Sequence, residues 1–222
     1  MIPAFLLSLK LALASAGLLL LLGTPLAYLL RRPFPGRALV ESVLLLPLAL
    51  PPTVLGFYLL LALGPEGPLA RLGAAPLAFT FPGMVIGATL FSFPFAFTAY
   101  REAFRALDPE LLATARTLGA GPAKRFFRVV LPLVWPGLVS GTLLGFAHAL
   151  GEFGVVLMVG GNIPGKTQVA STYLYDLVES LDFAAANRAS LILLAAAFGL
   201  VLLVRSLEER WRFATASDDR SP

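Results

Sequence analysis

Long apolar segments alternate with short polar ones along the whole chain. Runs of about 18 or more mostly apolar residues recur, and each is long enough to cross a hydrocarbon layer about 30 Å thick. Because no water is available there to satisfy backbone groups, such runs form helices. The pattern predicts an all-α membrane protein with transmembrane helices at residues 5–30, 38–63, 82–100, 134–159 and 189–204.

Composition agrees with a membrane protein and excludes several kinds of site. The chain is 58% hydrophobic and 14% charged, whereas an average soluble domain is roughly 25% charged. It has no cysteine and one histidine, so we expect no metal site and no cofactor. The formal net charge of +4 requires no nucleic-acid partner. We expect a single transmembrane domain over residues 1–222.

The distribution of positive charge predicts the orientation. Lysine and arginine are concentrated at residues 31–37, 101–132 and 205–222. Cytoplasmic loops carry such an excess, so these three segments are expected in the cytoplasm. The first apolar run continues well past Ala16, so we interpret it as an uncleaved helix and not a secretion signal. The N-terminus is then outside and the C-terminus inside, with a cytoplasmic tail that ends in disorder.

Prolines interrupt the second predicted span. Pro47, Pro51 and Pro52 each lack a backbone donor, so this helix should be kinked or broken near its middle. One interpretation is a kink that helix packing tolerates. The other is that the break lines a polar path, as discontinuous helices do in transporters.

The fourth predicted span carries an ionisable pair and a stripe of glycines. His148 and Glu152 are four residues apart and should share one helix face. The pair either fixes packing, through a mutual hydrogen bond or through bonds to neighbouring helices, or is part of a functional site, because ionisable groups are costly in hydrocarbon. Gly137, Gly141 and Gly145 predict close approach of another helix.

One segment matches a nucleotide-binding motif by letter. Residues 160–167 read GGNIPGKT, which fits the phosphate-binding pattern G-x-x-x-x-G-K-[ST]. That loop must follow a buried strand and open a helix, whereas here a membrane span precedes it on the outer side. We interpret the segment as an outer turn rich in glycine and proline.

The polar segment 101–132 contains nine charged residues and has internal order. Asp108 is a good N-cap, Pro109 fits the first helical position, and Gly119 supplies a left-handed stop. A second short helix should start at Pro122, with apolar and basic faces. These features fit equally a helix lying on the membrane surface and a helix that docks a soluble partner.

At these residues the sequence resembles the inner-membrane permeases of ATP-binding cassette (ABC) importers. Their EAA signature, E-A-A-x3-G-x9-I-x-L-P, aligns on Gly119 and ends at Leu131-Pro132. Ala113, Thr114 and Ala115 then stand at the E-A-A positions, so the signature glutamate is missing. The resemblance implies the type I importer fold and makes segment 101–132 the coupling loop that docks on an ATPase.

The resemblance is closer to the molybdate permease branch, while sulfate and tungstate permeases share parts of it. The residues that carry it are Gly23-Thr24-Pro25-Leu26-Ala27, Phe34-Pro35-Gly36, Leu50-Pro51-Pro52-Thr53-Val54, Ala115-Arg116-Thr117-Leu118-Gly119-Ala120, Gly151-Glu152-Phe153-Gly154 and Asn162-Ile163-Pro164-Gly165. The implied function is import of an oxyanion, most simply molybdate, across a bacterial or archaeal cytoplasmic membrane. An ATPase-independent secondary carrier is the alternative from another class.

The resemblance also implies partners and site residues. The partners are cytoplasmic ABC ATPase subunits that hydrolyse ATP, an extracytoplasmic oxyanion-binding protein, a second copy of the chain, and membrane lipid. This subunit itself performs no covalent chemistry. The coupling residues are Leu111, Leu112, Ala113, Thr114, Ala115, Arg116, Leu118, Gly119, Ala120, Phe127, Leu131 and Pro132. The candidate pathway or gate residues are Pro51, Pro52, Thr53, Ser92, His148, Glu152 and Phe153.

Overall fold

The computed structural model describes residues 1–218, and every regular element in that range is a helix. The first half contains α1 (Ile2–Leu18), η1 (Leu19–Gly23), α2 (Thr24–Leu29), α3 (Arg37–Leu45), η2 (Leu46–Leu48), α4 (Pro52–Leu63), α5 (Pro68–Arg71) and α6 (Phe81–Arg105). The second half contains α7 (Pro109–Thr117), α8 (Pro122–Arg125), η3 (Phe126–Val130), α9 (Leu131–Leu150), α10 (Gly154–Gly160), α11 (Ala170–Glu179) and α12 (Phe183–Asp218). The expected all-α class is confirmed.

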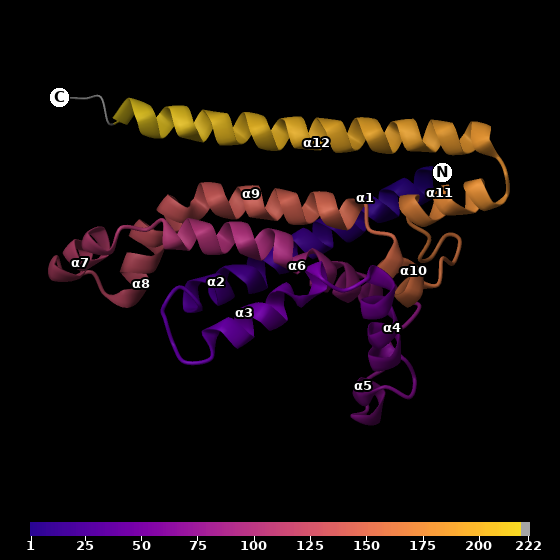
Figure 1. Ribbon diagram of the computed structural model, residues 1–222, viewed down its shortest axis with the longest axis horizontal. Coiled ribbons are helices and arrows are strands. Elements are labelled where there is room, and N and C mark those ends of the chain that lie inside the picture. The colour runs from indigo at the N-terminus through magenta and orange to yellow at the C-terminus, as the bar shows by residue number, and fades with distance from the viewer. Residues whose placement is uncertain (219–222) are drawn as a thin grey trace.

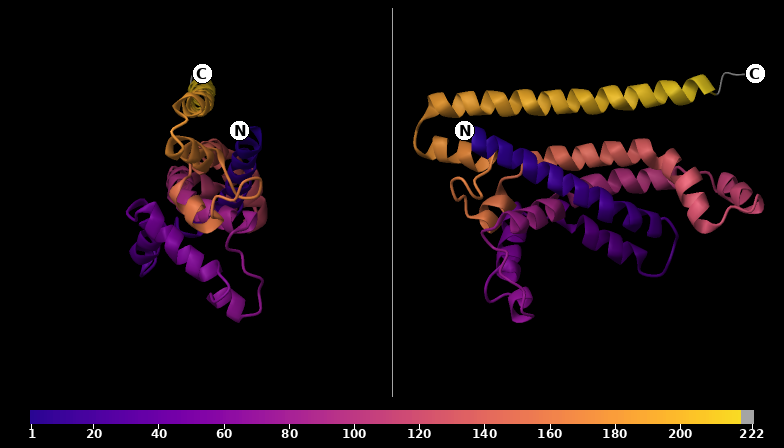
Figure 2. Two further views of the ribbon diagram at one scale, coloured as in Figure 1. Left: turned by 90° about the vertical axis from the view of Figure 1, so that its right-hand side faces the viewer. Right: turned by 180° about the vertical axis from the view of Figure 1, so that it is seen from behind.

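Helix α6 is the centre of an elongated bundle. It lies beside α9 through the middle of the molecule, with α1 and α2 on another side (Figure 1). Its side chains Phe97, Tyr100 and Phe104 are buried in one core cluster with Leu19 and Leu138. Helix α12 runs along the outside of the bundle next to α11 and α9 (Figure 2). The loop helices α7 and α8 therefore project from one end of the α6–α9 pair.

Five helical stretches of the described chain are long and apolar enough to cross a membrane. They are Ile2–Leu29, Pro52–Arg71, Phe81–Arg105, Pro122–Leu150 and Phe183–Ser206. The last begins six residues before the expected 189–204 and belongs to a helix that continues to Asp218. The end of the tail that was expected to be disordered, residues 219–222, lies outside the described residues.

The second predicted span is broken, as its prolines predict. Helix α3 ends at Leu45, a short 3-10 turn follows, and α4 begins only at Pro52. Figure 1 shows α3 running with the bundle and α4 turned across it. The break follows because residues 47, 51 and 52 cannot donate to the preceding turn, and the stretch long enough to cross a membrane is Pro52–Arg71, where the sequence predicted 38–63.

The fourth predicted span is also broken, and here a continuous helix over 134–159 is wrong. Helix α9 ends at Leu150, residues 151–153 are irregular, and α10 starts at Gly154. Gly151 and Gly154 flank Glu152 and Phe153, and glycine destabilises a helix interior relative to other residues. Glu152 consequently does not share a helical face with His148.

The glycine stripe brings α9 against α6, as expected. A methyl group added at Gly137 would lie 2.5 Å from the Cβ of Ala103. One added at Gly141 would lie 2.8 Å from the carbonyl oxygen of Ala96 and 2.7 Å from the ring of Tyr100. The two backbones are thus too close for any side chain at these positions.

We predict that Gly141→Ala lowers the free energy of unfolding by about 1–3 kcal/mol, the usual cost of overpacking a core. The added methyl group must displace either the Ala96 backbone or the fully buried Tyr100 ring. Thermal unfolding of the purified chain, followed by loss of the monodisperse peak in size-exclusion chromatography, measures the effect.

Gly17→Ala is the matched control, because Gly17 also lies in a membrane helix and no atom lies within 4 Å of a methyl group built there. Its unfolding temperature should equal or exceed that of the parent chain. Equal effects of the two substitutions would show that close α6–α9 contact is not what Gly141 provides.

Candidate functional site

The cytoplasmic-loop candidate, residues 101–132, folds as two short helices joined at a glycine hinge. Asp108 caps α7, since its Oδ1 accepts a hydrogen bond from the Glu110 backbone nitrogen at 2.8 Å. The helix ends at Thr117, and Gly119, two residues later, has a left-handed φ of +79°. The Ala120 nitrogen then donates to the Ala115 carbonyl oxygen at 3.1 Å, and α8 begins at Pro122. The cap, the hinge and the second start lie where the sequence predicts them.

The apolar side chains of this loop divide into a buried and an exposed set. Leu112 and Leu131 pack against the core cluster around Tyr100 and Phe104. In contrast, Leu118 is 82% exposed and Phe127 is 63% exposed. Of the other proposed coupling residues, Ala115 and Ala120 are half-buried, whereas Leu111, Ala113, Thr114, Arg116, Gly119 and Pro132 are exposed. The core thus fixes the loop while several of its apolar side chains remain uncovered.

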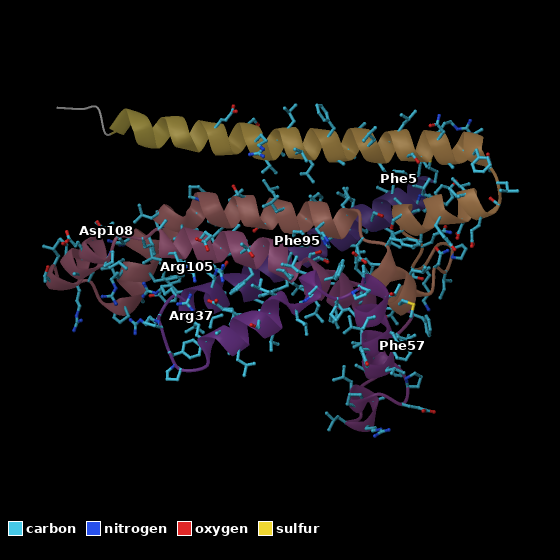
Figure 3. The ribbon with its side chains drawn as sticks, viewed as in Figure 1. Phe5, Arg37, Phe57, Phe95, Arg105 and Asp108 are labelled. Carbon is cyan, nitrogen blue, oxygen red and sulfur yellow. The ribbon has the colours of Figure 1, made fainter. Side chains whose placement is uncertain are left out.

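A cluster of charged residues ties the base of the loop to α3. The Glu41 carboxylate accepts from Arg37 Nε at 2.8 Å and from Arg101 Nη1 at 3.1 Å, and Arg105 Nη2 lies 4.0 Å away. Figure 3 labels Arg105 at the end of α6 and Arg37 at the start of α3, at the same end of the molecule as Asp108. The spacing of Arg37 and Glu41 suggests an i, i+4 pair. The pairing of Glu41 with Arg101 has no local sequence signal.

Polar side chains meet between α6 and α9, where the helices are close. Ser92 Oγ lies 3.0 Å from His148 Nδ1, and Tyr100 Oη lies 2.6 Å from Thr142 Oγ1. The His148 ring stacks on Phe95 with centroids 4.1 Å apart. His148 therefore finds its hydrogen-bond partner on the neighbouring helix α6, as one form of the packing interpretation expects, and Glu152 does not pair with it.

Glu152 stabilises the break between α9 and α10. It is 5% exposed, and its Oε1 accepts from the Val155 backbone nitrogen at 2.8 Å. Its own carbonyl oxygen accepts from Ser171 Oγ at 2.6 Å, which links the break to α11. The carboxylate thus replaces a helical acceptor that the break removes.

The two helix breaks lie against each other. A methyl group built at Gly154, the first residue of α10, would lie 2.7 Å from the Cβ of Pro52 at the start of α4. Phe153 contacts the Tyr175 ring at a centroid distance of 5.2 Å, while Pro51 and Thr53 are exposed. The structure therefore brings Pro52 and Glu152–Phe153 into one region. Ser92 meets His148, which lies less than one helical turn before the α9 break.

The segment that matches a phosphate-binding loop is a turn between α10 and α11. The Thr167 hydroxyl, which would be needed for a metal ion in such a loop, donates to the Gly160 carbonyl oxygen at 2.6 Å. It also accepts from the Ile163 backbone nitrogen at 2.9 Å. A helix and not a strand precedes the segment, so its geometry is not that of a nucleotide site. Among the described residues, no group of three or more His, Cys, Asp or Glu side chains could hold a metal ion.

Comparisons with known proteins agree with this architecture. The ModB permease protein of the molybdenum transport system of Azotobacter vinelandii is 46% identical over 191 residues, which cover 84% of this chain and 84% of that protein. The CysT permease protein of the sulfate transport system of Salmonella typhimurium is 33% identical over 193 residues, covering 85% of this chain and 70% of that protein.

A chain of a bacterial alginate ABC transporter, solved in complex with an alginate pentasaccharide-bound periplasmic protein, has the same fold. It superposes with a TM-score of 0.74 over 94% of this chain and 78% of its own length, at 20% sequence identity. The sequence profile described as "Binding-protein-dependent transport system inner membrane component" matches residues 19–212. The chain therefore belongs to this family, the inner-membrane permease subunits of ABC importers.

Proposed function

We propose that this chain forms the membrane pathway of an ATP-driven molybdate importer. The observation that carries the substrate is the 46% identity with a molybdenum transport permease, against 33% with a sulfate transport permease. The partners we propose are two cytoplasmic ATPase subunits, an extracytoplasmic oxyanion-binding protein and a second copy of this chain. ATP hydrolysis belongs to the ATPase subunits.

The orientation we propose has the N-terminus outside and loop 101–132 and the tail 205–222 in the cytoplasm. The excess of lysine and arginine in these segments supports it. Helices α7 and α8 then form the coupling loop on the ATPase side. Support comes from its rigid base, where Leu112 and Leu131 are packed, and from Leu118 and Phe127, whose exposed apolar surface suits a protein contact.

The pathway we propose runs past the two adjoining helix breaks and the Ser92–His148 pair. Thr53 is exposed in the first turn of α4, where backbone N–H groups have no acceptor within the helix, so such donors can guide an anion without holding it tightly. Glu152 is buried and occupied by the α10 backbone. Its part is to hold the break in place, because a carboxylate repels an anionic cargo.

We predict that molybdate uptake into proteoliposomes requires this chain, its ATPase, the binding protein and ATP together. Uptake of labelled molybdate is measured with and without ATP, and an ATPase variant that binds but does not hydrolyse ATP is the control. Competition with tungstate and sulfate reports the selectivity of the system. Uptake by this chain alone under an ion gradient would show a secondary carrier instead.

We also predict that Gly119→Val lowers ATP-driven uptake about 5-fold or more, while the chain still inserts in the membrane. A β-branched residue at a φ of +79° costs about 1–2 kcal/mol. Because the backbone relieves this strain by leaving the left-handed region, we expect the junction between α7 and α8 to shift. The variant is measured by uptake rate and by the yield of assembled complex.

Gly121→Val is the matched control for that substitution. Gly121 is two residues away and also has open space around its Cα, but its φ of −60° and ψ of 166° suit valine. Its uptake should stay close to that of the parent. Similar losses in both variants would argue against a conformational role for Gly119.

A further inference from the structure

A large basic cavity lies at the loop end of the molecule. Its volume is about 960 Å³, and it is bounded by the turn after α2, the end of α6, and helices α7 and α8. Its lining contains five arginines, namely Arg31, Arg32, Arg105, Arg116 and Arg125. No acidic residue is among the described residues that line it. Arg116 is also one of the proposed coupling residues, whereas the other four arginines belong neither to the proposed coupling contact nor to the proposed pathway.

Few of these charges are compensated within the protein. Arg105 pairs with Glu102 at 3.1 Å and lies 4.0 Å from Glu41. Among the side chains that the structure describes, the remaining arginines of the lining form no ion pair. Several guanidinium groups that share one concave surface repel one another, and a bound anion would reverse that cost.

One of the arginines is held rigidly in the cavity wall. Arg31 Nη2 donates to the Tyr28 hydroxyl at 3.1 Å, and its guanidinium carbon lies 4.2 Å from the centre of the Tyr28 ring. That ring is itself in edge contact with Phe104 and Phe126. Arg31 Nε is buried and has no hydrogen-bond partner among the described residues. The side chain is thus oriented before any ligand binds.

We propose that this cavity binds a phosphate-type oxyanion group. Arginine presents planar, paired donors that match the oxygens of such a group better than a lysine ammonium does. The cavity lies where the membrane stretches Ile2–Leu29 and Phe81–Arg105 end, which is the depth of lipid headgroups. Phe104, Leu107 and Leu112 add apolar surface to its wall. The group therefore comes either from an anionic phospholipid or from a free inorganic oxyanion.

The test uses the complex of this permease with its ATPase, stripped of native lipid in detergent. Three probes are titrated separately and detected by native mass spectrometry: a short-chain phosphatidylglycerol, a phosphatidylcholine of the same chain length, and inorganic phosphate. The parent should bind phosphatidylglycerol more tightly than phosphatidylcholine if a lipid supplies the group. Binding of phosphate with similar affinity would assign a free oxyanion instead.

A pair of double variants separates the cavity from the general charge of the loop. Arg32→Gln with Arg125→Gln removes two lining charges and touches none of the proposed coupling residues. Lys124→Gln with Arg128→Gln removes two charges from the same loop that do not line the cavity. We expect about tenfold or greater loss of affinity in the first pair, because hydrogen bonds to charged groups are lost, and little change in the second.

Three results would overturn the proposal. The first is an equal loss of anion affinity in both double variants. The second is no preference among the probes with no phosphate bound. The third is weaker association of the ATPase with the first double variant while no anion binds the parent, which would assign the arginines to acidic side chains of the partner. Uptake of molybdate is measured in parallel, so a failed anion site and a failed transport function give different results.

Discussion

The close contact between α6 and α9 is the constraint on which the other features depend. Glycines at positions 137, 141 and 145 remove the side chains that would separate the two helices. Polar groups of the two helices then reach one another, as Tyr100 and Thr142 do at 2.6 Å. In hydrocarbon these groups have no water with which to form hydrogen bonds. Their pairing therefore strengthens the α6–α9 contact that brings them together. The loop helices leave the end of α6 and return at the start of α9, so this contact also fixes the two ends of the loop.

The helix breaks obey the same requirement for satisfied backbone groups. A break at membrane depth is tolerated only where protein groups replace the lost helical partners. At the α9–α10 break, the Glu152 carboxylate and the Ser171 hydroxyl supply them. At the α3–α4 break, Pro51 and Pro52 need fewer partners because proline has no backbone donor. The start of α4 can then pack on the start of α10, which gathers the irregular backbone into one place.

Local signals in the sequence were sufficient for the loop but not for the contacts between distant segments. Asp108, Pro109 and Gly119 act on the backbone within a few residues, so the cap and the hinge of α7 could be predicted. The break at residues 151–153 could not, because glycine weakens a helix without specifying where it ends. The Ser92–His148 hydrogen bond joins residues 56 positions apart, and the Glu41–Arg101 bond joins residues 60 apart. Such pairs follow from the packing of α6, which no local pattern specifies.

The arginines and the exposed apolar residues of the loop occupy different surfaces of one small unit. Leu118 and Phe127 do not line the basic cavity, whereas Arg116 on α7 does. The opposite wall carries Arg31, which belongs to the turn after α2 and is held there by Tyr28. An anion bound between these walls would favour the arrangement in which they are close. By linkage, any partner that moves α7 away from that turn would weaken the binding of the anion. The bound anion would oppose that movement by the same free energy.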